Sequence, residues 1–332
     1  MRKKYLFIFI ILSLLSCRYL FSGEEKLYQS SFSDKKPVLD GKLEEEFWKG
    51  IEEKTNFIIL DTEKIAKKQT SFKIAYSKQA IYIGIRCEEP DMDKIVAQLK
   101  DEEGVWSEDS VEVFLFPDDE RTYYQFVVNT KGYRFNEKDK LGSVPLWDWK
   151  AKVYQGKDFY SVELEIPFSI LFSFPRKNNQ VWRINIARNI LTGPESEKHT
   201  CWPYLKGKEG FHNVENFAKI IFPQKISGEK VMAKGIPYYQ KEIKENLEKI
   251  SILQELLKEN ESSEEIKDYF EKCKELKKSF NEIHTPSYSY FSKLKFLLIE
   301  SENLIAEGTK LKNQVMKLKE EKKAEHLLDD LF

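Results

Sequence analysis

Most of the chain between Ser71 and Phe222 consists of short segments in which apolar and polar residues alternate. In the clearest of them, VWSEDSVEVFLF, Val111 and Val113 share one face of an extended chain, and Glu112 lies on the other. Gly, Asn, Asp and Pro separate the segments. Many short strands without long helices between them predict an antiparallel β-sandwich. The expected strands are 71–76, 80–87, 110–116, 122–129, 149–155, 159–166, 181–189 and 217–222, with brief helices at 43–49, 92–99 and 168–172.

The periodicity changes after Pro223. Apolar residues there recur at spacings of three and four, which is typical of amphipathic helices. Residues 238–332 are therefore predicted to form an α-helical bundle or coiled-coil tail, and the Gly- and Pro-containing residues 226–237 are predicted to be a linker. The three apolar stripes are Ile243, Leu247, Ile250 and Leu257; Ile266, Phe270, Cys273, Leu276, Phe280 and Ile283; and Leu294, Leu297, Leu304, Leu311, Val315 and Leu318.

The first residues have the pattern of an export signal. Arg2, Lys3 and Lys4 precede an apolar run that is too short to span a bilayer, and the run ends in LLSC. This ending resembles a bacterial lipobox, so residues 1–17 are expected to be a lipoprotein-type signal segment with lipidation at Cys17. An ordinary signal peptide cut elsewhere is the alternative. We expect a protein of the bacterial cell envelope, lipid-anchored to a membrane, with residues 18–36 as a tether and 37–225 as the sandwich.

Export has a consequence for the remaining cysteines, because the protein then meets an oxidising compartment. Cys87 and Cys201 are either bridged or two buried free thiols, since connectivity cannot be read from sequence. Cys273 falls on the apolar stripe of a predicted helix and is expected to be a core residue.

Seven motifs occur in an order that resembles the family 9 carbohydrate-binding module, or DOMON-like, β-sandwich. The resemblance covers roughly residues 37–222 and implies non-catalytic carbohydrate binding in support of polysaccharide capture or degradation. The partner that it implies is a glycan or oligosaccharide. The motifs are LDGKLEEEFW, FKIAYSKQAIYIGIRCEEPD, VWSEDSVEVFLF, YYQFVVNTKGYRFNE, VELEIPFSIL, WRINIARN and FHNVENFAKIIF.

Two loop tryptophans are the main candidates for the ligand site. Trp106 and Trp202 are flanked by polar residues, so each is either a lid over the end of the sheet or a platform for a ligand. The resemblance implies that they clamp a sugar ring between them. The resemblance also makes Glu112 an acceptor for sugar hydroxyls; its alternative is a solvated or Arg-paired strand residue. Trp147 and Trp149 are a second candidate pair.

Three further polar residues join the candidate ligand-binding set. Arg134 is a candidate bidentate donor to hydroxyls, with a plain surface charge as the alternative. Asn129 ends a strand, where an asparagine commonly caps the turn. Arg188 shares a strand face with core residues, so it needs a carboxylate partner and is expected to brace the site.

No residue is assigned a catalytic role. The chain lacks GxSxG, HExxH, P-loop and dinucleotide motifs, and Glu163 and Glu165 share a strand face, which is typical of a salt-bridged surface. No cofactor is expected to be required. Calcium is a weak option through Asp91, Glu108 and Asp109, but their spacing matches no calcium loop.

Other functions compete with glycan binding. A haem-binding DOMON-like module would have to use Met92, His199 or His212 as axial ligands. A structural lipoprotein would have a degenerate sandwich and would contact a protein partner, or itself, through the helical tail. A formal net charge of -1 over 332 residues argues against a nucleic-acid partner.

Overall fold

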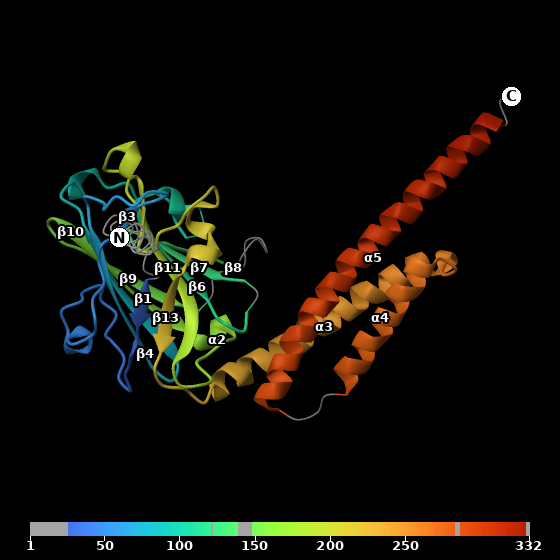
Figure 1. Ribbon diagram of the computed structural model, residues 1–332, viewed down its shortest axis with the longest axis horizontal. Helices are drawn as coiled ribbons and strands as arrows, with labels where there is room; N and C mark the ends of the chain where they lie inside the picture. The colour runs from blue at the N-terminus through green and yellow to red at the C-terminus, as the bar shows by residue number, and fades with distance from the viewer. Residues whose placement is uncertain (1–25, 102, 121, 139–147, 283–285, 330–332) are drawn as a thin grey trace, which may run out of the picture. The chain divides into compact units, whose positions relative to one another are not determined.

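The computed structural model describes residues 26–101, 103–120, 122–138, 148–282 and 286–329. The chain forms two compact units that divide between Gly228 and Glu229 (Figure 1). The first unit is a sandwich of two sheets, and the second unit is helical.

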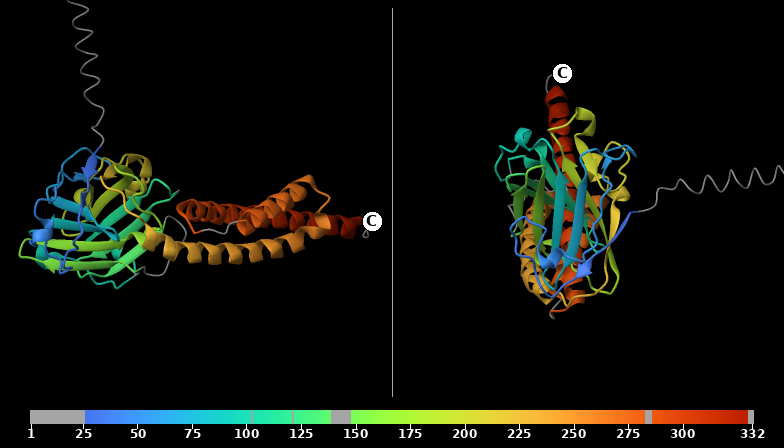
Figure 2. Two further views of the ribbon diagram at one scale, coloured as in Figure 1. Left: turned by 90° about the horizontal axis from the view of Figure 1, so that it is seen from below. Right: turned by 90° about the vertical axis from the view of Figure 1, so that its left-hand side faces the viewer.

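The first sheet has the strand order β1-β13-β11-β6-β7-β8, with β12 paired to β11 and β3 paired to β12. The second sheet has the order β2-β4-β5-β10-β9. Figure 2 shows the strands of the sandwich from two further sides. All neighbours are antiparallel except β1 with β13 and β2 with β4, which confirms the predicted sandwich and makes both sheets mixed. The strands are β1 Leu27–Gln29, β2 Ser31–Phe32, β3 Ile58–Ile59, β4 Thr70–Tyr76, β5 Ala80–Glu88, β6 Ser110–Phe116, β7 Tyr124–Asn129, β8 Arg134–Lys138, β9 Lys150–Gln155, β10 Phe159–Pro167, β11 Gln180–Asn189, β12 His199–Cys201 and β13 Ala218–Phe222.

Each of the eight predicted strands is present, with ends within two residues of the prediction. The predicted tether at 18–36 is wrong for its described part, because β1 and β2 pair with β13 and β4 as members of the two sheets. Tyr28 of β1 is fully buried and donates a hydrogen bond to the carbonyl of Glu52 at 2.6 Å. The brief helices are shorter than expected: η1 Glu46–Trp48, η2 Met92–Lys94 and α2 Phe168–Leu171.

Aromatic side chains fill the space between the sheets. Trp182 packs edge-on against Phe222, with ring centroids 4.8 Å apart, as its alternation with Ile184 predicts. Trp48 is also buried, but it covers the outer face of the second sheet and donates from Nε1 to Glu163 at 2.8 Å. Glu163 is therefore a buried anchor and not part of a salt-bridged surface.

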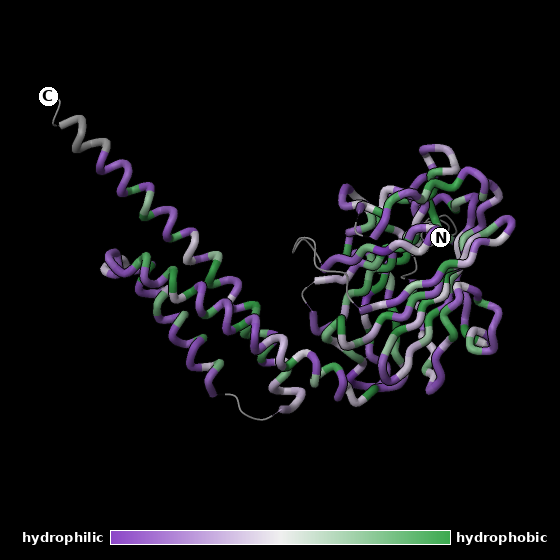
Figure 3. The backbone as a smooth tube through the Cα atoms, turned by 180° about the vertical axis from the view of Figure 1, so that it is seen from behind, coloured by the Kyte–Doolittle hydropathy of each residue, from purple (hydrophilic) through white to green (hydrophobic). Residues whose placement is uncertain are grey.

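The helical unit consists of α3 Glu229–Leu257, η7 Lys258–Asn260, α4 Glu264–Asn281 and α5 Tyr288–Asp329. Helix α4 runs antiparallel to α3 and α5, and α5 continues beyond them (Figure 1 and Figure 3). Members of all three predicted stripes are buried, among them Ile243, Cys273 and Leu304, whereas Leu318 is exposed and Ile283 lies outside the described residues. Asn246 and Ser301 form a buried hydrogen bond of 2.9 Å between α3 and α5. In α4 the buried residues are Ile266, Tyr269, Cys273 and Leu276. Tyr269 thus takes the buried position that was predicted for Phe270, whose side chain is only partly covered.

The predicted linker at 226–237 is wrong, because α3 begins at Glu229 and contains Pro237. Val231, Gly235, Tyr239 and Ile243 are buried at intervals of four, so the apolar stripe of the helix extends through the proline. No helix in the described part of the chain is long and apolar enough to cross a membrane. Cys87, Cys201 and Cys273 are free and buried. Of the two alternatives for Cys87 and Cys201, the structure therefore has two buried free thiols and no bridge between them.

Candidate functional site

The candidate site lies on the outer face of the first sheet, where one charged residue interrupts an apolar row. The pairing of five strands places Phe135, Val127, Glu112, Ala187 and Cys201 side by side across the sheet. Every member of this row except Glu112 is apolar. Because a buried carboxylate is costly, Glu112 needs hydrogen-bond partners on the same face.

Two amides supply these partners. Gln125 donates from Nε2 to Oε2 of Glu112 at 2.6 Å, and Asn189 donates from Nδ2 to Oε1 at 2.7 Å. Glu112 is 4% exposed, and this burial raises the pKa of its carboxyl group to about 7, although both amide hydrogen bonds oppose the shift. Glu112 is thus neither solvated nor paired with an arginine.

Asn189 connects Glu112 to two residues at the protein surface. Its Nδ2 lies 2.9 Å from the carbonyl oxygen of Trp106, and its Oδ1 lies 2.7 Å from Nδ1 of His199. We call Glu112, Gln125, Asn189 and His199 the polar cluster. Burial lowers the pKa of His199, so the neutral imidazole is favoured there.

Trp106 is an exposed aromatic residue whose backbone carbonyl accepts a hydrogen bond from the polar cluster. It lies in η3 Val105–Ser107, which follows Gly104 in a left-handed conformation (φ 90°) that glycine adopts without strain. The indole is 44% exposed and contacts Phe135 edge-on, with ring centroids 4.5 Å apart. Trp106 is therefore anchored at one edge and open to a ligand.

The expectation that Trp202 is a second exposed ring is wrong. Trp202 is 3% exposed and packs edge-on against Phe72 of the opposite sheet, with ring centroids 4.8 Å apart. The reason is β12, a strand that the sequence analysis missed. Because side chains alternate along a strand, Cys201 faces outward and Trp202 points between the sheets.

Arg134 and Asn129 are not part of the site that contains Glu112. Arg134 pairs with Val128 of β7, and Glu112 pairs with Val127, so the two side chains leave opposite faces of the sheet. The Arg134 guanidinium instead donates to the carbonyl oxygen of Trp149. Asn129 accepts at Oδ1 from the backbone N–H groups of Lys131 and Tyr133 at 3.1 and 3.0 Å, which is the turn-capping alternative.

Arg188 braces the sandwich from within, as its place on the core face predicts. It is fully buried and donates to Oε2 of Glu89 at 3.0 Å and to the carbonyl oxygen of Glu88 at 2.9 Å. Lys68 forms a second ion pair with Glu89, with Nζ 2.5 Å from Oε1. The ligand site therefore lies elsewhere.

The calcium candidates are engaged in other contacts. Glu108 accepts from the backbone N–H of Leu99 at 2.9 Å, and Asp109 accepts from that of Leu191 at 2.9 Å, so both fix loops. Asp91 lies 2.8 Å from Lys94 and 2.9 Å from Lys68, and these ammonium groups lower its pKa to about 2. Among the described residues, no group of three or more His, Cys, Asp or Glu residues could hold a metal ion.

The remaining candidates are also placed, with one exception. Trp149 is buried and donates from Nε1 to Oδ1 of Asn136 at 2.9 Å, whereas Trp147 lies outside the described residues. His212 hydrogen-bonds through Nδ1 to the hydroxyl of Tyr123 at 2.7 Å. The sequence analysis did not name Gln125 or Asn189, although both share a strand face with members of the apolar row.

Comparisons with known proteins agree with this fold. A proposed carbohydrate-binding protein from Bacteroides uniformis has a TM-score of 0.50 and 18% identity, over 60% of this chain and 100% of that one. A family 9 carbohydrate-binding module from Caldicellulosiruptor kristjanssonii, in complex with cellotriose, has a TM-score of 0.45 and 19% identity, over 61% of this chain and 97% of that one. The glucose complex gives a TM-score of 0.45 and 18% identity, over 61% and 98%.

Among curated proteins, none matches this chain. The profile of the family described as carbohydrate family 9 binding domain-like matches residues 39–224, which is more than half of the chain. The chain therefore belongs to the carbohydrate family 9 binding domain-like family.

Proposed function

We propose that the sandwich binds a carbohydrate, without catalysis, at Trp106 and the polar cluster. The observation that carries this proposal is that Trp106 is 44% exposed and that its backbone carbonyl oxygen accepts a hydrogen bond from Asn189 of the polar cluster. A sugar ring has an apolar C–H face that stacks on an aromatic ring and hydroxyls that need polar partners. Family membership supports the same ligand class.

Each residue of the site has a separate role in this proposal. Trp106 supplies the stacking surface, and His199 is an exposed polar side chain of the same cluster that can contact a sugar hydroxyl. Asn189 holds both in place, while Glu112 and Gln125 orient Asn189 from below. With one exposed ring in place of two, we expect modest affinity, because sugar hydroxyls must also be desolvated.

Trp106→Ala tests this proposal. We expect roughly five- to tenfold weaker binding of cellotriose or another neutral oligosaccharide, measured by isothermal titration calorimetry, because the stacking surface is lost. The fold should persist, since Trp106 lies outside the space between the sheets. Tyr154→Ala is the matched control, because Tyr154 is a 36% exposed aromatic residue on an edge strand of the other sheet. Wild-type affinity in Trp106→Ala would place the ligand elsewhere.

We also propose that the protein is exported and lipid-anchored at Cys17, where it captures polysaccharide at the cell envelope. The support is the basic start, the apolar run and the LLSC sequence. Metabolic labelling with a fatty-acid analogue should mark the wild type and not Cys17→Ser. Equal labelling of the two proteins contradicts the anchor.

A second candidate function is that of a structural lipoprotein whose helical unit binds a protein or a second copy of the chain. The observation that favours it is the burial of Trp202, which leaves only one of the two predicted platform tryptophans exposed. A groove of about 430 Å³ in the helical unit, lined in part by Ile266, Leu311 and Val315, is where such a contact would form. Failure of the wild type to bind any glycan, together with self-association in analytical ultracentrifugation, would favour this function.

A further inference from the structure

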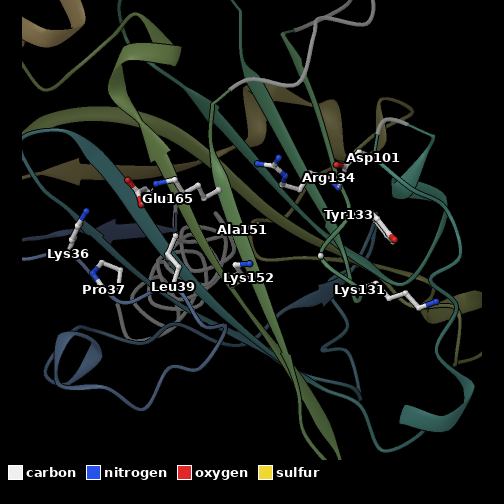
Figure 4. Close-up of a pocket in the computed structure, with 12 residues that line it drawn as sticks. Lys36, Pro37, Leu39, Asp101, Lys131, Tyr133, Arg134, Ala151, Lys152 and Glu165 are labelled. Atoms are coloured by element: carbon white, nitrogen blue, oxygen red, sulfur yellow. Dashed lines mark hydrogen bonds and ion pairs between the residues drawn. The ribbon is translucent and has the colours of Figure 1, made fainter.

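A polar groove opens between the edge strands β8 and β9, on the opposite side of β8 from Trp106. Its volume is about 740 Å³, which is within the range of small-molecule and cofactor sites. Figure 4 shows Lys131, Tyr133 and Arg134 on one side of it and Lys36, Leu39 and Glu165 on the other.

Hydrogen bonds fix both walls of the groove. On one side, Oε2 of Glu163 accepts from the backbone N–H groups of Asp40 and Gly41 at 2.9 and 2.7 Å, which holds the segment that contains Leu39. On the other side, Oδ1 of Asp101 accepts from the backbone N–H of Arg134 at 2.7 Å. The groove is therefore largely pre-formed.

The groove carries an excess of positive charge. Its lining includes five cationic side chains and two acidic ones. Lys150 lies 3.7 Å from Glu165, and Arg134 donates to the carbonyl oxygen of Trp149. In the described ranges of the chain, no carboxylate lies within ion-pair distance of the three remaining ammonium groups. These belong to Lys36, Lys131 and Lys152.

We propose that this groove binds an acidic sugar, one that carries a carboxylate or sulfate group. Unpaired ammonium groups suit such anions, and the Leu39 side chain offers apolar surface to the sugar carbons. A concave site fits a glycan better than it fits a membrane surface, which needs cations on a projecting face.

The groove and the Trp106 surface are connected through the same packed side chains. The inference therefore rests on the proposed glycan binding at Trp106. Tyr133 lines the groove and also packs in the cluster of Val105, Val127 and Phe135, and Phe135 contacts Trp106. The structure thus assigns the basic groove to the anionic units of a glycan whose neutral units contact Trp106.

The test is calorimetry on the full-length chain with trigalacturonate, a sulfated carrageenan oligosaccharide and neutral cellotriose. Lys131→Ala/Lys152→Ala should bind the better anionic ligand roughly fivefold more weakly than the wild type, because each exposed ion pair contributes little. Cellotriose binding should not change. Wild-type affinity for the anionic ligand should fall as salt is raised. Lys177→Ala/Lys225→Ala is the matched control, since both residues are exposed on the sandwich outside the groove.

The outcomes separate the two proposals. Cellotriose binding that depends on Trp106, without tighter binding of either anionic ligand, overturns the groove and keeps the proposed function. Anionic binding that depends on Lys131 and Lys152, together with cellotriose binding that is unchanged in Trp106→Ala, keeps the groove and overturns the Trp106 site. Anionic phosphatidylglycerol vesicles provide a further arm: loss of vesicle binding in the double variant, with no binding of either anionic sugar by the wild type, assigns the groove to a lipid surface and overturns the proposal.

Discussion

At the scale of single residues, Glu112 has the clearest energetic consequence. Its carboxylate lies in an apolar row and, among the described residues, accepts from the amides of Gln125 and Asn189. These bonds do not fully replace the lost water, so the pKa rises from 4.5 to about 7. The folded protein therefore holds a proton at Glu112 over a pH range in which the unfolded chain has released it.

Replacing Glu112 by Gln tests this effect. The stabilisation from the raised pKa is complete below about pH 4.5 and is lost as the pH rises towards about 7. We expect the free energy of unfolding of the wild type, minus that of Glu112→Gln, to fall over this range and to level off above it. Urea unfolding at a series of pH values measures the difference. A difference that is constant, or that grows with pH, would contradict the burial cost of Glu112.

The two loop tryptophans show how far residue-level prediction reached. Trp106 and Glu112 both come from the motif around the start of β6, and Asn189 donates to the backbone carbonyl of the first and to the carboxylate of the second. Trp202 was misplaced because polar neighbours suggest a loop, whereas three residues of β12 turn its ring inward. A three-residue strand is too short to show a period of two, so its side-chain direction depends on pairing with β11.

At the scale of elements, sequence reasoning found the strands that have a core face of their own. Strands β6, β10 and β11 have seven or more residues and show clear alternation. Strands β1, β2 and β3 have two or three residues, and β8 carries the polar sequence RFNEK. These strands form because partner strands pair with them. Their own sequences therefore do not predict them, since the pairing depends on residues elsewhere in the chain.

Helix α3 gives a prediction at this scale. Pro237 is exposed in the helix interior and has no N–H to donate to the carbonyl of Ala233. Pro237→Ala should restore that bond and stabilise the helical unit by about 1–3 kcal/mol. Circular dichroism at 222 nm during denaturation measures the change. Lys234→Ala, at an exposed position of the same helix, should change stability by less than about 0.5 kcal/mol. An unchanged or lower midpoint for Pro237→Ala would mean that the proline suits the helix.

At the scale of the whole molecule, the chain divides where the periodicity of its sequence changes. The boundary between Gly228 and Glu229 separates a unit with strand alternation from one with helical stripes. Gly228 has a φ of 67°, and a Cβ there would lie 2.0 Å from the Phe174 ring, so the end of the sandwich is closely packed up to this residue. Each unit has its own buried residues, which predicts two separate unfolding transitions.

The distribution of tryptophan makes these transitions distinguishable. All six tryptophans precede Gly228, so their fluorescence reports on the sandwich, and circular dichroism at 222 nm reports mainly on the helices. Ile186→Ala removes a fully buried side chain between the sheets and should cost about 2–5 kcal/mol. We expect it to lower the midpoint of the fluorescence transition and to leave the midpoint of the helical transition unchanged. Pro237→Ala should raise the midpoint of the helical transition and leave that of the fluorescence transition unchanged. Combining the two substitutions should give additive shifts, because the sites share no partners. If either substitution moves both transitions equally, the two units unfold as one cooperative structure. The division at Gly228 would then be geometric, and the two units would not be independently stable.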